Sequence, residues 1–190
     1  MSDVHEIRYI FVPIDGTRPS EEALPYALVI AGAAGKVTLI EVIPESEPLR
    51  KPFGAVSMSG EEVIEMLKGL AQEDLDKAAT DWQPLAPDVP LDRLIGQGDA
   101  SSVIIQSAED HSFDLIALAS AARGAVGRLA LGSVSDKVMR ESTMPVLVVR
   151  QDPENEERKL PTIKRVIVAL DGSDRAMLAL PIAAALGKQM

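Results

Sequence analysis

Apolar residues along this chain gather in short, nearly continuous runs that alternate with stretches of helical periodicity. The first run spans residues 7–14 and ends in Asp15-Gly16. A run without apolar–polar alternation is typical of a strand buried on both faces, as in a parallel sheet covered by helices. Similar runs predict four further strands, at residues 36–43, 91–95, 113–120 and 145–150.

The stretch after the first predicted strand has the features of a helix. Ser20 can cap its N-terminus, and the two glutamates that follow suit the positive end of the helix dipole. Gly35 can cap its C-terminus, so the helix is predicted from about Ser20 to Ala34. Pro25 falls early in this helix and is expected to bend it.

A longer helix is predicted in the middle of the chain. Prolines and glycines over residues 44–57 indicate a loop. Ser59 and Glu62 then form a capping box, which opens a helix to about Trp82. The residues at helical spacing that should form its buried stripe are Val63, Leu67, Leu70, Leu75, Ala78 and Trp82.

Two shorter helices complete the alternation of strands and helices. One is expected from Gly98-Asp99 to about Asp110, and the other over residues 132–142. Each lies between two predicted strands, which favours right-handed crossovers between parallel neighbours. The sequence therefore predicts an α/β fold: an open, doubly wound, five-stranded parallel sheet flanked by helices.

The opening of this domain recurs near the end of the chain. Residues 163–170 form another apolar run, and it ends in Asp171-Gly172, 156 positions after Asp15-Gly16. At the same spacing, Ile7 matches Ile163, Val12 matches Val168, Leu24 matches Leu180 and Pro25 matches Pro181. We therefore predict a duplication. The predicted parts are a complete domain at residues 1–150, a charged linker at 151–162, and the first strand and helix of a truncated second copy at 163–190.

Two questions about this repeat stay open at the level of sequence. Any two strand-Asp-Gly-helix units look alike, so coincidence is the rival to duplication. One strand and one helix cannot bury their own apolar faces. The unit at residues 163–190 is therefore either a fragment of a tandem protein or a tail that docks on another surface, such as a partner chain.

Charge and composition narrow the classes of partner. The formal net charge is -10, and such a surface repels nucleic acid and anionic membranes, because neutralising phosphates needs clustered Lys and Arg. No apolar run approaches the ~20 residues that span a bilayer, and the polar N-terminus does not resemble a signal peptide. The chain has no cysteine, which fits a reducing compartment. We expect a cytoplasmic protein that binds neither nucleic acid nor membrane.

Candidate ligand-binding residues follow from the predicted sheet. In an open α/β sheet, ligands bind at the carboxyl ends of the strands, near the point where the strand order reverses. Asp15, Val42 and residues 119–122 follow three of the predicted strands, and Gly132-Ser133 opens the last helix of the domain. Asp15 can accept hydrogen bonds from a ligand, and a Gly-Ser helix start offers N–H groups to a phosphate. A turn role for Asp15 and a plain N-cap role for Gly132-Ser133 are equally open.

Taken together, these motifs resemble the universal stress protein family. The resemblance rests on Asp15-Gly16-Thr17 after the first strand, Gly98-Asp99-Ala100, FDLIALAS at 113–120, and LALGSVSDKVMRESTMPVLVVR at 129–150. It covers residues 7–150, and again residues 163–187 as the start of a tandem copy. It implies an adenine nucleotide alpha hydrolase-like fold and a homodimer or other homo-oligomer, often joined through the last strand.

The resemblance also implies where ATP would bind. Many members bind ATP through a Gly-x-x-Gly-x9-Gly-Ser/Thr loop. The residues that such a site assigns here are Asp15, Val42, Ala119, Ala122, Gly132, Ser133 and Val134. The first two belong to the adenosine end and the last three to the phosphate end. The chain has Ala119 and Ala122 where the loop has glycines, and a Cβ at both positions narrows the pocket.

We therefore predict a non-enzymatic universal stress protein with a degenerate nucleotide site and no expected cofactor. It would act through oligomerisation or through an unidentified protein partner. The alternative is an ATP- or AMP-binding sensor whose occupancy controls assembly. A third function, slow ATP hydrolysis, would need a water-positioning residue that the sequence does not reveal. His5 and His111 lie apart from residues spaced as a triad or a metal site, so no catalytic residue and no metal ligand is predicted.

Overall fold

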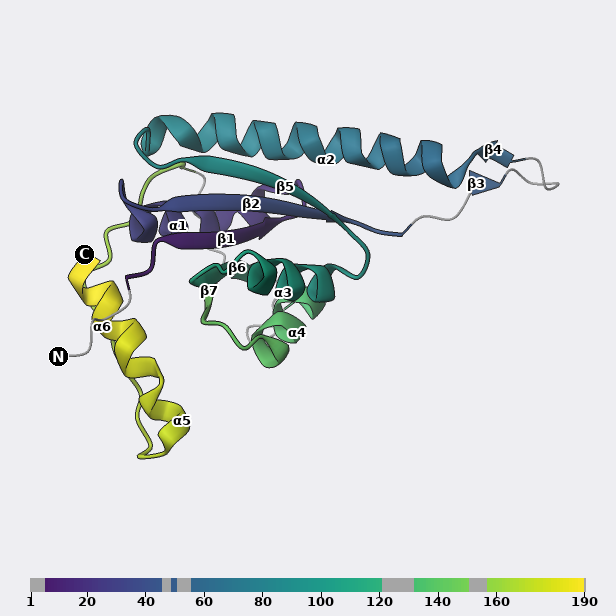
Figure 1. Cartoon of the computed structure of the whole chain (residues 1–190). Helices are drawn as coiled ribbons and strands as arrows, with labels where there is room; N and C mark the ends of the chain where they lie inside the picture. The colour runs from purple at the N-terminus through teal and green to yellow at the C-terminus, as the bar shows by residue number, and fades with distance from the viewer. Residues whose placement is uncertain (1–5, 46–48, 51–55, 121–131, 151–156, 190) are drawn as a thin grey trace.

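A five-stranded parallel sheet forms the centre of the protein (Figure 1). The structure is a computed structural model that describes residues 6–45, 49–50, 56–120, 132–150 and 157–189. The strand order is β5-β2-β1-β6-β7. The strands are β1 (Tyr9–Ile14), β2 (Lys36–Ile43), β5 (Leu91–Gln97), β6 (Leu115–Ser120) and β7 (Val146–Arg150). The predicted α/β fold with five parallel strands is confirmed.

The central strand, β1, is paired on both edges. It runs parallel to β2 over its whole length and parallel to β6 at Ile10 and Phe11. The side chains of Ile10, Phe11 and Val12 are all fully buried. Neighbouring strands satisfy its backbone groups and helices cover both of its faces, which explains why its sequence lacks polar alternation.

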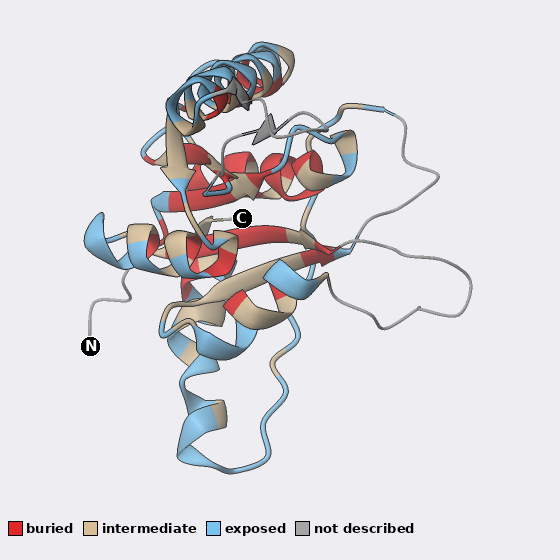
Figure 2. Ribbon diagram, turned by 90° about the vertical axis from the view of Figure 1, so that its right-hand side faces the viewer, coloured by how far each residue is buried: buried red, intermediate tan, exposed pale blue. Residues whose placement is uncertain are grey.

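Helices cover both faces of this sheet (Figure 2). Successive β1 side chains point to opposite faces, so Ile10 and Val12 join one core cluster and Phe11 joins another. The first cluster lies against α1 and α2, and the second against α3 and α4. These helices are α1 (Leu24–Ala31), α2 (Gly60–Trp82), α3 (Ala100–Asp110) and α4 (Ser133–Glu141). Among the described helices, none is both long and apolar enough to cross a membrane.

The capping box predicted at the start of α2 is present. Ser59 Oγ accepts the N–H of Glu62 at 3.2 Å, and Glu62 Oε2 accepts the N–H of Ser59 at 2.6 Å. The predicted buried stripe is confirmed at Val63, Leu75, Ala78 and Trp82, whereas Leu67 is only partly buried and Leu70 is 52% exposed. Ala71 is fully buried, so the stripe passes beside Leu70 rather than through it. The N-terminal end of α2 projects past the sheet in Figure 1.

The helix after β1 begins differently from the prediction. Ser20 is not its N-cap; the chain first forms a 3₁₀ helix, η1 (Arg18–Ala23), after Thr17. The α-helix begins only at Leu24, so Pro25 lies in its first turn, where the missing N–H costs no hydrogen bond. The sequence predicted a bent α-helix at Pro25, whereas the structure has a 3₁₀ helix that is followed by an α-helix just before Pro25.

The same helix ends at Gly32 rather than before Gly35. Gly32 has φ +56, and its N–H donates to the carbonyl of Leu28 at 3.1 Å. With ψ −176, this is an extended conformation at positive φ that essentially only glycine adopts. Gly35 is needed for a different reason: a Cβ there would overlap the carbonyl oxygen of Arg8, so the missing side chain lets the chain pass close to the segment before β1.

A short antiparallel hairpin lies within the loop predicted after β2. Its strands are β3 (Leu49–Arg50) and β4 (Val56–Met58). The sequence predicted only a loop here, because strands of two and three residues are too short for apolar alternation to show.

Residues 163–170 form no strand, and the prediction of a strand there is wrong. The chain has no regular structure over residues 158–171 and becomes helical at α5 (Asp174–Met177) and α6 (Ala179–Gln189). A strand needs a neighbour for its backbone groups, and the described part of the chain places none beside this segment. The helix predicted to end near Lys188 is confirmed. The assignment of residues 163–190 to a second, truncated domain stays a prediction.

In the described chain, polar contacts join the C-terminal segment to the first domain at two places. In one, Gln189 Nε2 donates to the carbonyl of Ile7 at 2.8 Å, and Ala185 is buried against the core. In the other, Arg158 Nη2 lies 2.7 Å from Asp81 Oδ2 and 3.6 Å from Glu21 Oε2.

Glu21 and Trp82 form the buried centre of this second contact. Glu21 is 4% exposed, and its Oε2 accepts the indole N–H of Trp82 at 2.7 Å. The guanidinium groups of Arg18 and Arg158 lie 5.1 Å and 6.0 Å from the centroid of the Trp82 ring, within the range of cation–π attraction. Glu21, Trp82, Asp81, Arg18 and Arg158 are called the linker clamp below.

Candidate functional site

A cavity of about 150 Å³ lies at the carboxyl ends of β1, β2 and β6. The chain continues from β1 to β2 on one side of the sheet, and β6 lies on the other side of β1. The cavity therefore sits where the strand order reverses, the place at which open α/β sheets bind ligands. Its lining residues are Pro13, Ile14, Asp15, Ser20, Ile40, Val42, Ala100, Ile104, Leu118, Ala119, Val134 and Ser135.

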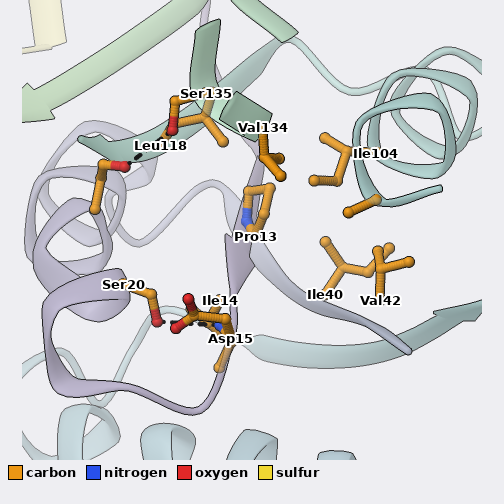
Figure 3. A pocket seen from close by; sticks show the side chains of 12 residues that line it. Pro13, Ile14, Asp15, Ser20, Ile40, Val42, Ile104, Leu118, Val134 and Ser135 are labelled. Atoms are coloured by element: carbon orange, nitrogen blue, oxygen red, sulfur yellow. Dashed lines mark hydrogen bonds between the residues drawn. The ribbon is translucent and has the colours of Figure 1, made fainter. Parts of the chain in front are cut away.

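The cavity has a polar end and an apolar end (Figure 3). Asp15 and Ser20 lie together at the polar end, while Ile40, Val42 and Ile104 gather at the apolar end. An apolar slot with a few polar groups at fixed positions is typical of pockets that hold a small organic ligand in one orientation.

Asp15 takes part in the turn that follows β1. Its Oδ1 accepts the backbone N–H of Thr17 at 3.1 Å and the Thr17 hydroxyl at 2.5 Å. Gly16 has φ +73, and a Cβ at this position would overlap Oδ2 of Asp74. The turn role considered for Asp15 is therefore present. In the described residues Asp15 Oδ2 has no hydrogen bond, so it can accept one from a ligand.

An ion pair joins the two helices that form the far wall of the cavity. Asp99 caps α3 by accepting the N–H of Ser102 at 3.0 Å, and Nζ of Lys137 on α4 lies 3.0 Å from the same oxygen. Hydrogen bonds, first from Ser102 and then from Ser101 and Lys137, hold the pKa of Asp99 well below its usual range. The pair stays charged at neutral pH and fixes the spacing of α3 and α4 around the cavity.

Four of the seven residues assigned to the predicted site line this cavity: Asp15, Val42, Ala119 and Val134. Gly132 is the N-cap of α4, Ser133 is exposed, and neither lines the cavity. Ala122 lies outside the described residues. A ligand-binding role for these seven residues stays a prediction.

The apolar wall of the cavity was not predicted from the sequence. Ile40 lies two positions before Val42 on β2, so both side chains point to the same face. That spacing is the feature from which Ile40 could have been predicted. Ile104 could not have been predicted in this way, because its place depends on how α3 packs against the sheet.

Glu41 places a half-buried carboxyl on the opposite face of β2. Its Oε2 is buried and accepts no hydrogen bond from the residues that the structure describes. Burial, and then the carboxylates of Asp74 and Asp15, raise the pKa of Glu41 from 4.5 to about 7. An incompletely ionised carboxyl group therefore lies close to the polar end of the cavity at neutral pH.

Replacing Glu41 with glutamine should stabilise the protein above pH 7. The folded state favours protonated Glu41, so the unfolding free energy of the native sequence falls as the pH rises from 4.5 to about 7 and is level above that range. The shift corresponds to about 3 kcal/mol at most, which partial solvent screening reduces to about 1–2 kcal/mol. Urea denaturation of Glu41→Gln at pH 8 should show this gain, and at pH 4.5 the gain should be small.

A matched control is Glu45→Gln, which changes an exposed glutamate just beyond the same strand. It should leave the unfolding free energy within about 0.5 kcal/mol at either pH. A gain for Glu41→Gln that does not depend on pH would contradict the titration of Glu41 as its cause.

The arrangement of the cavity suits recognition of part of a small molecule. Asp15 Oδ2 can accept a hydroxyl or amine hydrogen, and the apolar end can pack against a ring. The volume of about 150 Å³ is half the lower end of the ~300–1,000 Å³ range of drug-sized pockets, so the described walls enclose a base or a sugar rather than a whole nucleotide. Within the described ranges, no group of three His, Cys, Asp or Glu side chains is placed to hold a metal ion.

A family profile and several known proteins indicate one family. The profile of the universal stress protein family matches residues 6–150. A universal stress protein of Methanocaldococcus jannaschii is 31% identical over 148 residues, which cover 75% of this chain and 81% of the relative. A solved universal stress protein from Archaeoglobus fulgidus has a TM-score of 0.73 at 24% identity and covers 97% of this chain, which spans 64% of that structure. A family member from Arabidopsis thaliana, solved with AMP bound, has a TM-score of 0.52 at 18% identity, covering 77% of this chain and 93% of that one.

Proposed function

Because this chain belongs to the universal stress protein family, we propose that its cavity binds the adenosine part of an adenine nucleotide and that the protein is not a catalyst. One observation carries the proposal: an apolar slot ends at the carboxylate of Asp15, where the strand order reverses. The base would pack against Val42 and Ile104, and Asp15 Oδ2 would accept a ribose hydroxyl or an amine hydrogen. AMP on the same fold in the Arabidopsis protein supports this choice of ligand.

In this proposal the bound nucleotide acts as a signal. Its occupancy would change how the protein assembles or which partner it binds. Asp15 and Ser20 line the cavity, and Ser20 lies within η1, which also carries Arg18 and Glu21 of the linker clamp. A shift at the polar end of the cavity would therefore move Arg18 and Glu21 and change their contacts with the linker. A cytoplasmic location is part of the same proposal.

A second candidate function is assembly or partner binding without any nucleotide. Ala119 favours it, because this residue lines the cavity at a position where the family loop has a glycine. The small volume of the cavity favours it as well. In that case the chain would keep the family fold and act only through its surfaces.

AMP binding to Asp15→Asn tests the proposed function. Asparagine keeps an oxygen for the Thr17 turn but replaces the second carboxylate oxygen with an amide group. Hydrogen bonds to charged groups contribute about 1.5–3 kcal/mol, so AMP affinity should fall by about tenfold or more. Equilibrium dialysis with AMP at one fixed ionic strength measures the change.

Asp171→Asn is the matched control. Asp171 makes the same turn, since its Oδ1 accepts the N–H of Ser173 at 2.9 Å, but it does not line the cavity. This variant should bind AMP as tightly as the native chain. Equal losses in both variants would contradict the role of Asp15. If the native chain binds no AMP, the second candidate function replaces the first, and binding gained by Ala119→Gly with Ala122→Gly would identify the two methyl groups as the obstacle.

A further inference from the structure

The C-terminal unit carries an exposed apolar strip. The exposed fractions are 39% at Val166, 82% at Ile167 and 50% at Leu170. The equivalent residues of β1, 156 positions earlier, are at most 5% exposed. Pale blue covers much of this unit in Figure 2, in contrast to the red of β1. The same sequence pattern is thus buried in the first domain and open to solvent in the second unit.

The turn after this strip has the geometry of the turn after β1, but no neighbouring side chain packs against its glycine. Asp171 Oδ1 accepts the N–H and the hydroxyl of Ser173 at 2.9 Å and 2.6 Å, and Gly172 has φ +84. Beside Gly16 the space for a Cβ is occupied by Asp74, whereas beside Gly172 nothing lies within 4 Å. The unit therefore holds the conformation of a strand end and leaves its surroundings open.

The backbone of residues 163–170 has no strand partner in the described chain. Unpaired N–H and C=O groups beside exposed apolar side chains form an edge to which another strand can add. The unit also lies away from the sheet in Figure 1, so a second molecule can approach it.

The charges around the strip favour a second copy of this chain as the partner. Lys164 and Arg165 precede the apolar positions, and Asp171 follows them. If two copies pair antiparallel about an axis through Val168, Arg165 of each copy lies opposite Asp171 of the other. Parallel pairing in register would instead place each arginine beside the same arginine of the other copy. Opposite charges across a strand pair stabilise it, and like charges destabilise it.

We propose that residues 163–170 pair antiparallel with the same residues of a second copy and join two chains across a two-fold axis. The contact is self-complementary, so it closes at two chains and does not propagate into a filament. It buries Ile167 of both copies and satisfies backbone groups that are open in the single chain. This surface differs from β7, the last strand of the sheet, through which family members often pair.

The first test is the mass of the native chain and of Ile167→Glu by sedimentation or light scattering. The native chain should show twice its 20.3 kDa mass, and Ile167→Glu should remain a single chain. Met66→Glu is the matched control, because Met66 is also an exposed apolar residue, 44% exposed, but lies on α2. It should leave the pairing unchanged. Neither substitution falls in the sheet, so circular dichroism should show that both variants are folded.

A charge exchange tests the antiparallel pairing. Arg165→Glu should raise the dissociation constant of the dimer by about tenfold or more, because it sets like charges opposite each other at both ends. Adding Asp171→Lys to the same chain should restore the native value. The pairing is overturned if the native chain is monomeric, if Ile167→Glu still dimerises, or if the double variant dimerises no better than Arg165→Glu.

Discussion

Replacing Gly16 with alanine is expected to lower the unfolding free energy by about 2–3 kcal/mol and to weaken AMP binding. At φ +73, an alanine carries about 1–2 kcal/mol of backbone strain. Its methyl group would also overlap the Asp74 carboxylate, so that side chain must rotate away from the turn. Because the turn orients Asp15, the polar end of the cavity should be displaced as well. Urea denaturation and equilibrium dialysis on the same preparation measure both effects.

The repeat supplies a matched control in Gly172→Ala. Gly172 has φ +84, but nothing lies within 4 Å of the position of its Cβ. An alanine here would carry only the backbone strain, so the unfolding free energy should fall by less than about 2 kcal/mol. AMP binding should not change. Equal losses of stability at the two positions would contradict the part assigned to Asp74.

Replacing Glu21 with alanine should lower the unfolding free energy by about 2–4 kcal/mol. The substitution leaves the buried indole N–H of Trp82 without its acceptor and removes one of the two carboxylates that hold Arg158. The linker should then detach more often from the first domain. Guanidinium denaturation measures the stability, and the rate of tryptic cleavage after Arg158 measures the detachment.

Glu73→Ala is the control for this experiment, because Glu73 is exposed on the same long helix. Its unfolding free energy should stay within about 0.5 kcal/mol of the native value, and cleavage after Arg158 should keep its native rate. If Glu21→Ala were cleaved no faster than Glu73→Ala, the clamp could not be what holds the linker.

The sheet could be predicted because its strands are buried on both faces. The run at residues 36–43 is apolar enough to mark β2 with its observed bounds. Local hydrogen bonds were equally predictable, as the capping box of Ser59 and Glu62 shows. Leu70 was misplaced because both Leu70 and Ala71 fit the helical spacing, and only the packing of α2 decides that Ala71 is the residue that points inward.

The prediction at residues 163–170 failed for a related reason. An apolar run shows that a segment can be a strand, but a strand also needs a neighbour, and that neighbour lies elsewhere in sequence. The residues that line the cavity fall into the same two groups, those that the sequence predicts and those that only tertiary packing places. Asp15 directly follows β1 and Val42 lies at the end of β2, so both could be predicted, whereas Ile104 enters the wall only through the packing of α3.

The position of Trp82 has a practical consequence for studying this protein. It is the only tryptophan in the chain, it is 1% exposed, and its indole N–H is bonded to Glu21. The guanidinium of Arg158 lies 6.0 Å from the centroid of its ring. The intrinsic fluorescence of the protein therefore comes from the place where the linker meets the first domain. Detachment of the C-terminal unit can be followed by tryptophan emission in the native sequence, with no dye attached.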